Sequence, residues 1–356
     1  MQAIIVDIYV DSGSRPTVFV LDFMANMDQG FYIPNWKVTM RLMKTDKPIA
    51  APVRGPGAVP ASLITESILE HLAREIGMHP ILLKELNLYE KGQVAQAVAH
   101  GLGIPLDFVK VRPNQNNVTP NAFATGGSTT SERCVASALG AVSILKERLA
   151  PFREKMPDAP WPGLVQAAHF GNTHLQASSC HFQNGDPLVY FTYMTSVTET
   201  ELDVLTGEYQ VRRVDIMADL GESLNPTIDI GQIEGGFTFG LGVYLLEDVK
   251  YNEMTGAVLT DGTFEYKPPT TKDIPIDWRI HLMPDAPNPV GILSSKAVGE
   301  PPVGLAVSAL LAIRTAAHSV RDDLEKTDGE TVVEAPFTVE KAQQMIGITV
   351  DNLRVI

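Results

Sequence analysis

Cysteine is scarce in this chain: Cys134 and Cys180 are the only two among 356 residues. Two cysteines cannot build a disulfide scaffold or a four-cysteine metal or iron–sulfur site within the chain. A single disulfide could join them, although we favour two reduced core thiols. The eight histidines are scattered without metal-ligand spacing. A zinc or non-haem iron site is therefore not expected.

Basic residues are also in short supply, with 28 Lys and Arg against 42 Asp and Glu and a net charge of −14. This balance argues against nucleic-acid binding, which needs clustered cations. The first residues lack the basic start and apolar stretch of a signal peptide. The most apolar run, Val303 to Ile313, is far shorter than the ~20 residues that span a bilayer. We therefore expect a cytoplasmic protein without a membrane or nucleic-acid partner.

What is present is typical of a folded protein: 44% of the residues are hydrophobic and 20% are charged. A chain of this length can bury a large core and favours two or more domains. Hydrophobic periodicity and turn residues predict the following elements: two strands within 3–23 and one over 104–113, helices near 61–77, 94–101, 132–149 and 230–246, a loop over 150–163, a hairpin or meander over 188–218, a hairpin with turns at Thr255-Gly256 and Asp261-Gly262, and a helix from Pro301 to about Ser319. This order predicts an α+β fold, with a domain boundary near Glu90.

A glycine- and hydroxyl-rich run, Thr125 to Glu132, leads directly into a predicted helix. Glycines let a backbone approach a ligand, and the N–H groups of a helix start attract anions. The run could therefore cradle a phosphate or a pterin. The structural alternative is a capped helix start, because Thr129 and Glu132 also have capping-box spacing. Spacing alone favours the capped helix.

Two further positions could carry chemistry. Glu300 stands just before a helix whose first residues are prolines, and a helix N-terminus favours the ionised form of a carboxylate. Such a carboxylate beside Gly299 could be a general base, although a plain helix-end charge is the commoner case. Arg54 lies in a turn-rich loop, where it could contact an anion or an oxo ligand or simply face solvent.

Seven separated runs, in order, resemble segments of the xanthine dehydrogenases and aldehyde oxidases, the molybdenum hydroxylases. They are MDQGFYIPN (27–35), VRGPG (53–57), LGIPLDFVKV (102–111), ATGGSTTSE (124–132), IGQIEGGFTFGLG (230–242), YKPPTTKDIPIDWRI (266–280) and KAVGEPP (296–302). The last run is very similar to the C-terminal signature of the family. The runs are spread along the sequence, so the resemblance covers nearly the whole chain, and it is specific because the separated runs agree in order.

The resemblance implies an oxidoreductase with a molybdenum–molybdopterin cofactor. Glu300 occupies the position of the family's base, and Arg54 a position beside the molybdenum. Gly127 occupies a main-chain contact to the cofactor near the metal. Gly126, Ser128 and Ser131 line the same loop. The pterin dithiolene, and no protein side chain, would hold the metal.

The substrate class follows from a position in the same register. Asp22 stands where xanthine dehydrogenases carry a substrate-anchoring Arg. The alternative is that Asp22 merely ends a strand and faces solvent. In either case the purine-anchoring Arg is missing. A carboxylate there would repel the charge that develops on a purine, which favours an aldehyde oxidase-like substrate. Pro56 replaces the aromatic residue of the family's R-x-F-G run, which puts the usual aromatic sandwich of the substrate in doubt.

Parts of the family pattern are missing. The 2Fe-2S and FAD domains and the front of the first molybdopterin domain are absent, and a stretch is missing between Tyr89 and Val94. We therefore predict residues 1–89 as the end of one molybdopterin-binding domain and 90–356 as the second, in a homodimer that acts on aldehydes or N-heterocycles. The alternatives are xanthine dehydrogenase-like purine hydroxylation and a catalytically inactive remnant that serves as a dimerisation partner.

Overall fold

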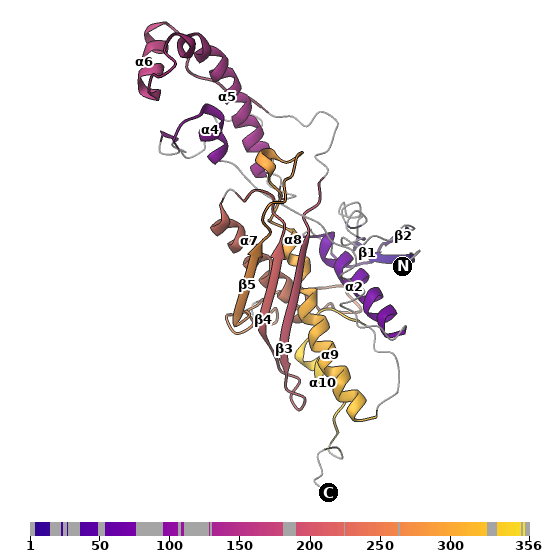
Figure 1. The fold of residues 1–356 in the computed structure, drawn as a ribbon. Coiled ribbons are helices and arrows are strands. Elements are labelled where there is room, and N and C mark those ends of the chain that lie inside the picture. The colour runs from indigo at the N-terminus through magenta and orange to yellow at the C-terminus, as the bar shows by residue number, and fades with distance from the viewer. Residues whose placement is uncertain are drawn as a thin grey trace.

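The computed structural model of the chain is shown in Figure 1. It describes residues 4–14, 23, 27, 36–48, 54–75, 95–105, 108–109, 128, 130–180, 190–223, 225–262, 264–325, 333–349 and 352.

A three-stranded sheet lies at the centre of the C-terminal half. Strands β3 (Met194–Leu202) and β4 (Tyr209–Ala218) form an antiparallel hairpin, and β5 (Asp277–Leu282) pairs with β4 in parallel. Val211, Val214 and Ile216 of β4 are buried. The hairpin turns at Gly207, whose φ of +78° suits a glycine. The hairpin over 188–218 is therefore confirmed.

Helices bury the inner face of this sheet. Helix α9 (Val307–Asp323) packs along β3, and the short α8 (Pro301–Leu305) packs against α7 (Pro226–Leu241). Helix α10 (Val339–Ile346) lies beside α9, at the opposite end from α5 (Figure 1). A π-helical turn, η2 (Gly242–Leu246), extends α7. The predicted helix near 230–246 is confirmed, and Ile233, Phe237 and Leu241 of α7 and Leu245 of η2 are buried.

The stretch Pro301–Asp323 is the one helical stretch of the described chain that is long and apolar enough to cross a membrane. It is longer than the apolar run from Val303 to Ile313 on which the sequence-based expectation rested. Half of the most apolar 18-residue segment of this stretch is buried inside the structure, with Leu310 and Ile313 fully enclosed. Arg314 on the same helix is also buried, over the ring of Phe337 at 5.6 Å. These contacts are those of a core helix.

The N-terminal part joins this core through α2 (Ala58–Glu75), which packs on α8 and confirms the predicted helix over 61–77. The fully buried Tyr244 donates a hydrogen bond from its hydroxyl to the Val59 carbonyl, over 2.8 Å. Strand β1 (Ile4–Asp11) pairs in parallel with β2 (Trp36–Met43). The sequence did not predict β2, and the second predicted N-terminal strand falls largely outside the described residues.

Three helices form a separate group at one end of the structure (Figure 1). They are α4 (Ala95–Leu102), α5 (Thr130–Lys155) and α6 (Trp161–Phe170). The predicted helices near 94–101 and over 132–149 are confirmed. The predicted loop over 150–163 is wrong, because α5 continues through Pro151. Beyond Pro151, Phe152 packs closely on the end of α6, since a Cβ on Gly171 would lie 2.6 Å from its ring.

The remaining sequence predictions have mixed outcomes. The turn at Thr255-Gly256 is confirmed by the bridge between Tyr251 and Val258. Among the described residues there, the pairing does not extend beyond this single bridge. Cys134 and Cys180 are free, as expected, but both are exposed instead of lying in the core. Most of the predicted strand over 104–113 and the boundary near Glu90 lie outside the described residues, so the division into two domains stays a prediction. The fold class, α+β, is confirmed.

The close approach of α7 and α8 yields a stability prediction. A Cβ on Gly240 would lie 2.3 Å from the Val303 carbonyl oxygen, whereas a Cβ on Gly231 of the same helix would meet nothing within 4 Å. We expect Gly240→Ala to lower the free energy of unfolding by about 1–3 kcal/mol through overpacking. Gly231→Ala should raise it by about 0.5–1 kcal/mol through helix propensity. Urea denaturation measures both, and equal effects would show that the helices can separate freely.

Candidate functional site

Residues from four distant segments meet at the corner before α8. Arg54 precedes α2, Ser128 precedes α5, Gln232 lies on α7, and Gly299 and Glu300 form the corner itself. Three of these segments contain positions that the sequence indicates as candidates. The fold thus gathers Arg54, Ser128 and Glu300, although Arg54 and the Gly299 that it contacts are 245 positions apart in the chain.

Arg54 ties its own segment to two of the others. Its Nε donates a hydrogen bond to the Gly299 carbonyl, and its Nη2 donates to the Gln232 carbonyl over 3.0 Å and to the Gln232 Oε1 over 3.3 Å. The guanidinium also lies over the Phe239 ring, 5.9 Å from its centre. A planar fork of donors can serve several acceptors at once, which an ammonium on a flexible chain does less well.

Two opposing effects act on the pKa of Arg54, namely its burial and a neighbouring carboxylate. Partial burial lowers the pKa of the guanidinium below its usual value, and the nearby Glu300 opposes this by raising it. An arginine remains protonated at neutral pH in either case. The corner therefore holds a fixed positive charge close to Glu300.

Glycines allow this close approach. A Cβ on Gly236 would lie 3.2 Å from Arg54 Nη2 and 2.7 Å from the Cβ of Pro302. A Cβ on Gly299 would lie 2.5 Å from the Ser128 Oγ. Either added carbon would force its neighbours to move, so the glycines set how tightly the segments meet.

Glu300 occupies the N-cap position of α8, with φ of −100° and ψ of −36°, and its side chain makes no capping hydrogen bond to that helix. The residue is half-buried. A simple helix cap would accept a hydrogen bond from the first turn, as Asn225 does for Ile228 of α7. The carboxylate is thus not engaged in capping its own helix.

The glycine-rich run lies only partly within the described residues. Ser128 adopts a left-handed φ of +56° and lies against Gly299. Gly126 and Gly127 lie outside the described residues, as does the capping residue Thr129. The backbone of Ser131 belongs to the first turn of α5, while its side chain lies outside the described part. The structure therefore brings one residue of this run to the corner.

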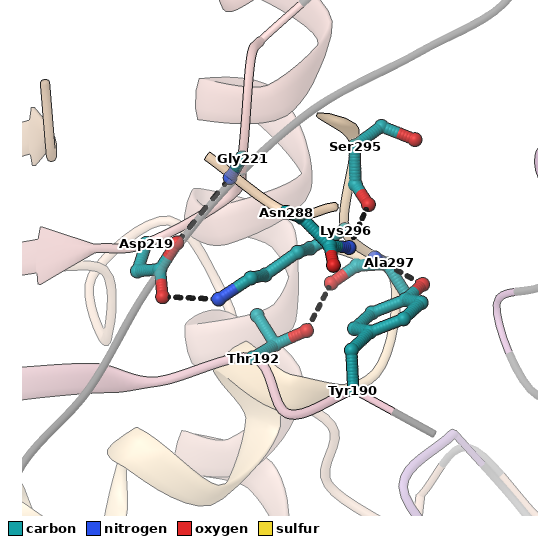
Figure 2. Close-up of polar contacts among 8 residues, drawn as sticks. All are labelled: Tyr190, Thr192, Asp219, Gly221, Asn288, Ser295, Lys296 and Ala297. Atoms are coloured by element: carbon teal, nitrogen blue, oxygen red, sulfur yellow. Dashed lines mark hydrogen bonds and ion pairs between the residues drawn. The ribbon is translucent and has the colours of Figure 1, made fainter. Parts of the chain in front are cut away.

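The segment that leads to the corner is held by residues that the sequence did not single out. Lys296 forms a buried ion pair with Asp219, which directly follows β4 (Figure 2). Tyr190 and Thr192 contact the backbone of Ala297. The available signals were a lysine in the run that resembles the family signature, and an aspartate at the end of a buried strand. Their pairing depends on tertiary structure.

This arrangement combines a half-buried carboxylate, a fixed cation and a set of close backbone approaches. It suits a site that takes a proton from one group while it holds negative charge on another. In the described ranges, no three His, Cys, Asp or Glu side chains gather as they would around a metal ion. The polar side chains that the structure does bring to the corner include the Arg54 guanidinium and the Ser128 hydroxyl.

Comparison with protein families gives two matches along the chain. Both family models are described as "Molybdopterin cofactor-binding domain", and they match residues 1–88 and 91–275. Among curated proteins, the xanthine dehydrogenase 1 of Arabidopsis thaliana is 37% identical over 265 residues, which cover 70% of this chain and 19% of that protein. The xanthine dehydrogenase/oxidase of Rattus norvegicus is 36% identical over 239 residues, 64% of this chain and 18% of that protein. The chain thus spans about a fifth of their length.

Solved structures share the fold at lower sequence identity. Quinoline 2-oxidoreductase from Pseudomonas putida 86 superposes with a TM-score of 0.81 and 17% identity, over 97% of this chain and 60% of that one. Aldehyde oxidoreductase from Desulfovibrio gigas gives a TM-score of 0.72 and 17% identity, over 96% of this chain and 47% of that one. These matches concern the fold alone.

The bridge made by Arg54 leads to a testable expectation. Arg54→Met removes the donors to the Gly299 and Gln232 carbonyls, so we expect the free energy of unfolding to fall by about 1–3 kcal/mol. Arg279, whose ion pair with Asp277 is exposed, provides the control: Arg279→Met should cost less than about 1 kcal/mol. Chemical denaturation compares the two. A loss no larger for Arg54 than for Arg279 would mean that the bridge does not hold the corner.

Proposed function

Because the chain belongs to the xanthine dehydrogenase and aldehyde oxidase family, as its molybdopterin cofactor-binding region, we propose that it forms a molybdenum hydroxylase site at the corner before α8. The proposed reaction is oxidation of an aldehyde to a carboxylic acid, or hydroxylation of an N-heterocycle, with Glu300 as the base. The remaining parts of such an enzyme, its iron–sulfur and flavin domains, are not part of this chain.

The observation that carries the proposal is the meeting of Arg54, Ser128 and Glu300. The three residues belong to separate sequence runs, each of which resembles the family on its own, and contacts through Gly299 link them. The donor set fits a pterin cofactor, since a guanidinium and a glycine-opened corner offer hydrogen bonds and close backbone approach. Arg54, Ser128 and the neighbouring Gly126, Gly127 and Ser131 would hold the cofactor.

When bound, the molybdenum–molybdopterin cofactor supplies the oxygen transfer and accepts the substrate's electrons. Glu300 would accept a proton from the group that attacks the substrate carbon. Its half-buried position limits its contact with water, and the neighbouring Arg54 would help keep it ionised until it takes up the proton. Arg54 would in addition stabilise negative charge that develops at the site.

A second candidate is purine hydroxylation, because the curated relatives named above are xanthine dehydrogenases. Against it stands Asp22, which takes the position of a purine-anchoring Arg and lies outside the described residues. An aldehyde requires no such cation. We therefore place the aldehyde first and the purine second.

The remaining alternative is a role without catalysis, in which the chain acts as a dimerisation partner of complete subunits. Molybdenum content and aldehyde oxidation with an artificial electron acceptor separate the two roles. Metal near one atom per chain with turnover supports the enzyme, and absence of both leaves the dimerisation partner.

Replacement of the base tests the mechanism directly. Glu300→Gln removes the proton acceptor and keeps the shape, so we expect turnover to fall by about 10²–10⁴-fold while the fold and the molybdenum content are retained. Glu253→Gln, at an exposed turn, serves as the control and should leave turnover unchanged. Retained turnover in the Glu300 variant would exclude Glu300 as the base.

Substrate preference gives a separate test. If Asp22 replaces the anchoring cation, an aromatic aldehyde should show a higher kcat/KM than xanthine, by at least about tenfold. Steady-state assays with both substrates in one preparation measure the ratio. A ratio that favours xanthine would assign the chain to the purine hydroxylases and remove the argument from Asp22.

A further inference from the structure

We propose that the buried ion pair between Lys296 and Asp219 is a positioning device that fixes the backbone on which Glu300 is carried. The inference rests on the proposed function in one respect, because the residue that is positioned is the proposed base. Lys296 and Asp219 themselves are positioning residues, and they contact neither substrate nor cofactor in this proposal.

The ion pair is deeply buried, with 7% of the Lys296 side chain and 1% of the Asp219 side chain exposed. Asp219 also accepts a hydrogen bond from the Gly221 amide over 3.3 Å, and the Lys296 ammonium lies 5.7 Å from the centre of the Tyr193 ring. A buried ion pair often stabilises a fold no better than well-packed apolar residues of similar volume. Its presence here is better explained by the single geometry that it imposes on the chain.

The backbone around Lys296 is held in the same way (Figure 2). The Lys296 amide donates to the Leu220 carbonyl over 3.1 Å, and the Asn288 side-chain amide donates to the Ser295 carbonyl over 2.6 Å. At Ala297, the amide donates to the Tyr190 hydroxyl over 3.0 Å, and the carbonyl accepts from the Thr192 hydroxyl over 3.1 Å. Residues 295–297 are therefore fixed against the end of β4 and the segment before β3.

Only Val298 separates this fixed segment from the corner. Val298 is buried, with 5% of its surface exposed. The next residue, Gly299, accepts the hydrogen bond from Arg54 and packs against Ser128. The backbone that carries Glu300 is thus held on one side by the ion pair and on the other by Arg54. A displacement at Lys296 would pass through two residues to Gly299, and would move the carboxylate away from its place beside Arg54.

A purely stabilising role makes a different prediction from a positioning role. Either single substitution, Lys296→Met or Asp219→Leu, leaves a buried charge without its partner and risks unfolding the chain. The double variant Lys296→Met/Asp219→Leu removes both charges and replaces them with apolar side chains. If the pair served only stability, the double variant and the unmodified protein would show the same exchange rates when each is measured at the same interval below its own melting temperature. If the pair positions the corner, the double variant stays folded and the corner becomes mobile.

The experiment measures hydrogen–deuterium exchange by mass spectrometry on the full chain, at equal distance below each melting temperature. The double variant should exchange at least about tenfold faster than the unmodified protein in peptides over 296–300, with no change over the interior of α7. In molybdenum-loaded protein, kcat for an aldehyde should fall by up to about 10²-fold while KM stays within about twofold, because misplacement of a base affects the chemical step.

The matched control is Arg213→Met/Asp215→Leu, which removes an ion pair from β4 whose two side chains are 37% and 35% exposed. It should leave exchange over 296–300 and kcat unchanged. Unchanged exchange over 296–300 in the Lys296/Asp219 double variant would overturn the inference, as would changes equal to those of the control. The exchange result does not depend on Glu300 being the base. Failure of the proposed function would instead be seen as retained turnover in Glu300→Gln, so the two failures can be told apart.

Discussion

The contact between the Arg54 guanidinium and the Gly299 carbonyl is the constraint on which the site depends. It joins the segment before α2 to the corner before α8, and the same guanidinium reaches Gln232 on α7. Three parts of the chain that are far apart in sequence are thereby fixed at one place. Because a guanidinium has several donors in a rigid plane, one side chain can set the relative position of all three.

The packing around the corner explains why so many small residues surround it. Gly236, Gly240 and Gly299 lie where an added Cβ would come within 3.0 Å of a neighbouring segment. The helices α7 and α8 therefore approach more closely than ordinary side chains permit, and the sheet with α9 supplies the rigid support behind them. The site is in this way a product of the core: the same helices that bury Phe237 and Val303 carry the residues that face the corner.

Much of the fold could be predicted from local patterns, because the helices α2, α5 and α7 and the β3–β4 hairpin have clear periodicity and turn residues. Pro151 misled the prediction, since the packing of Phe152 on Gly171 cannot be inferred from nearby residues. Glu300 and Arg54 could be predicted because their sequence runs resemble a family. Asp219 could not, because its partner lies 77 residues away and a lone aspartate after a strand carries no distinctive spacing.

If Glu300 and Arg54 face a molybdenum–pterin cofactor at this corner, a crystal structure of the molybdenum-loaded protein will show it most directly. We predict anomalous scattering from molybdenum beside Ser128 and Arg54, with the Glu300 carboxylate directed toward the metal. Molybdenum bound elsewhere, or a Glu300 carboxylate directed into solvent, would contradict this assignment.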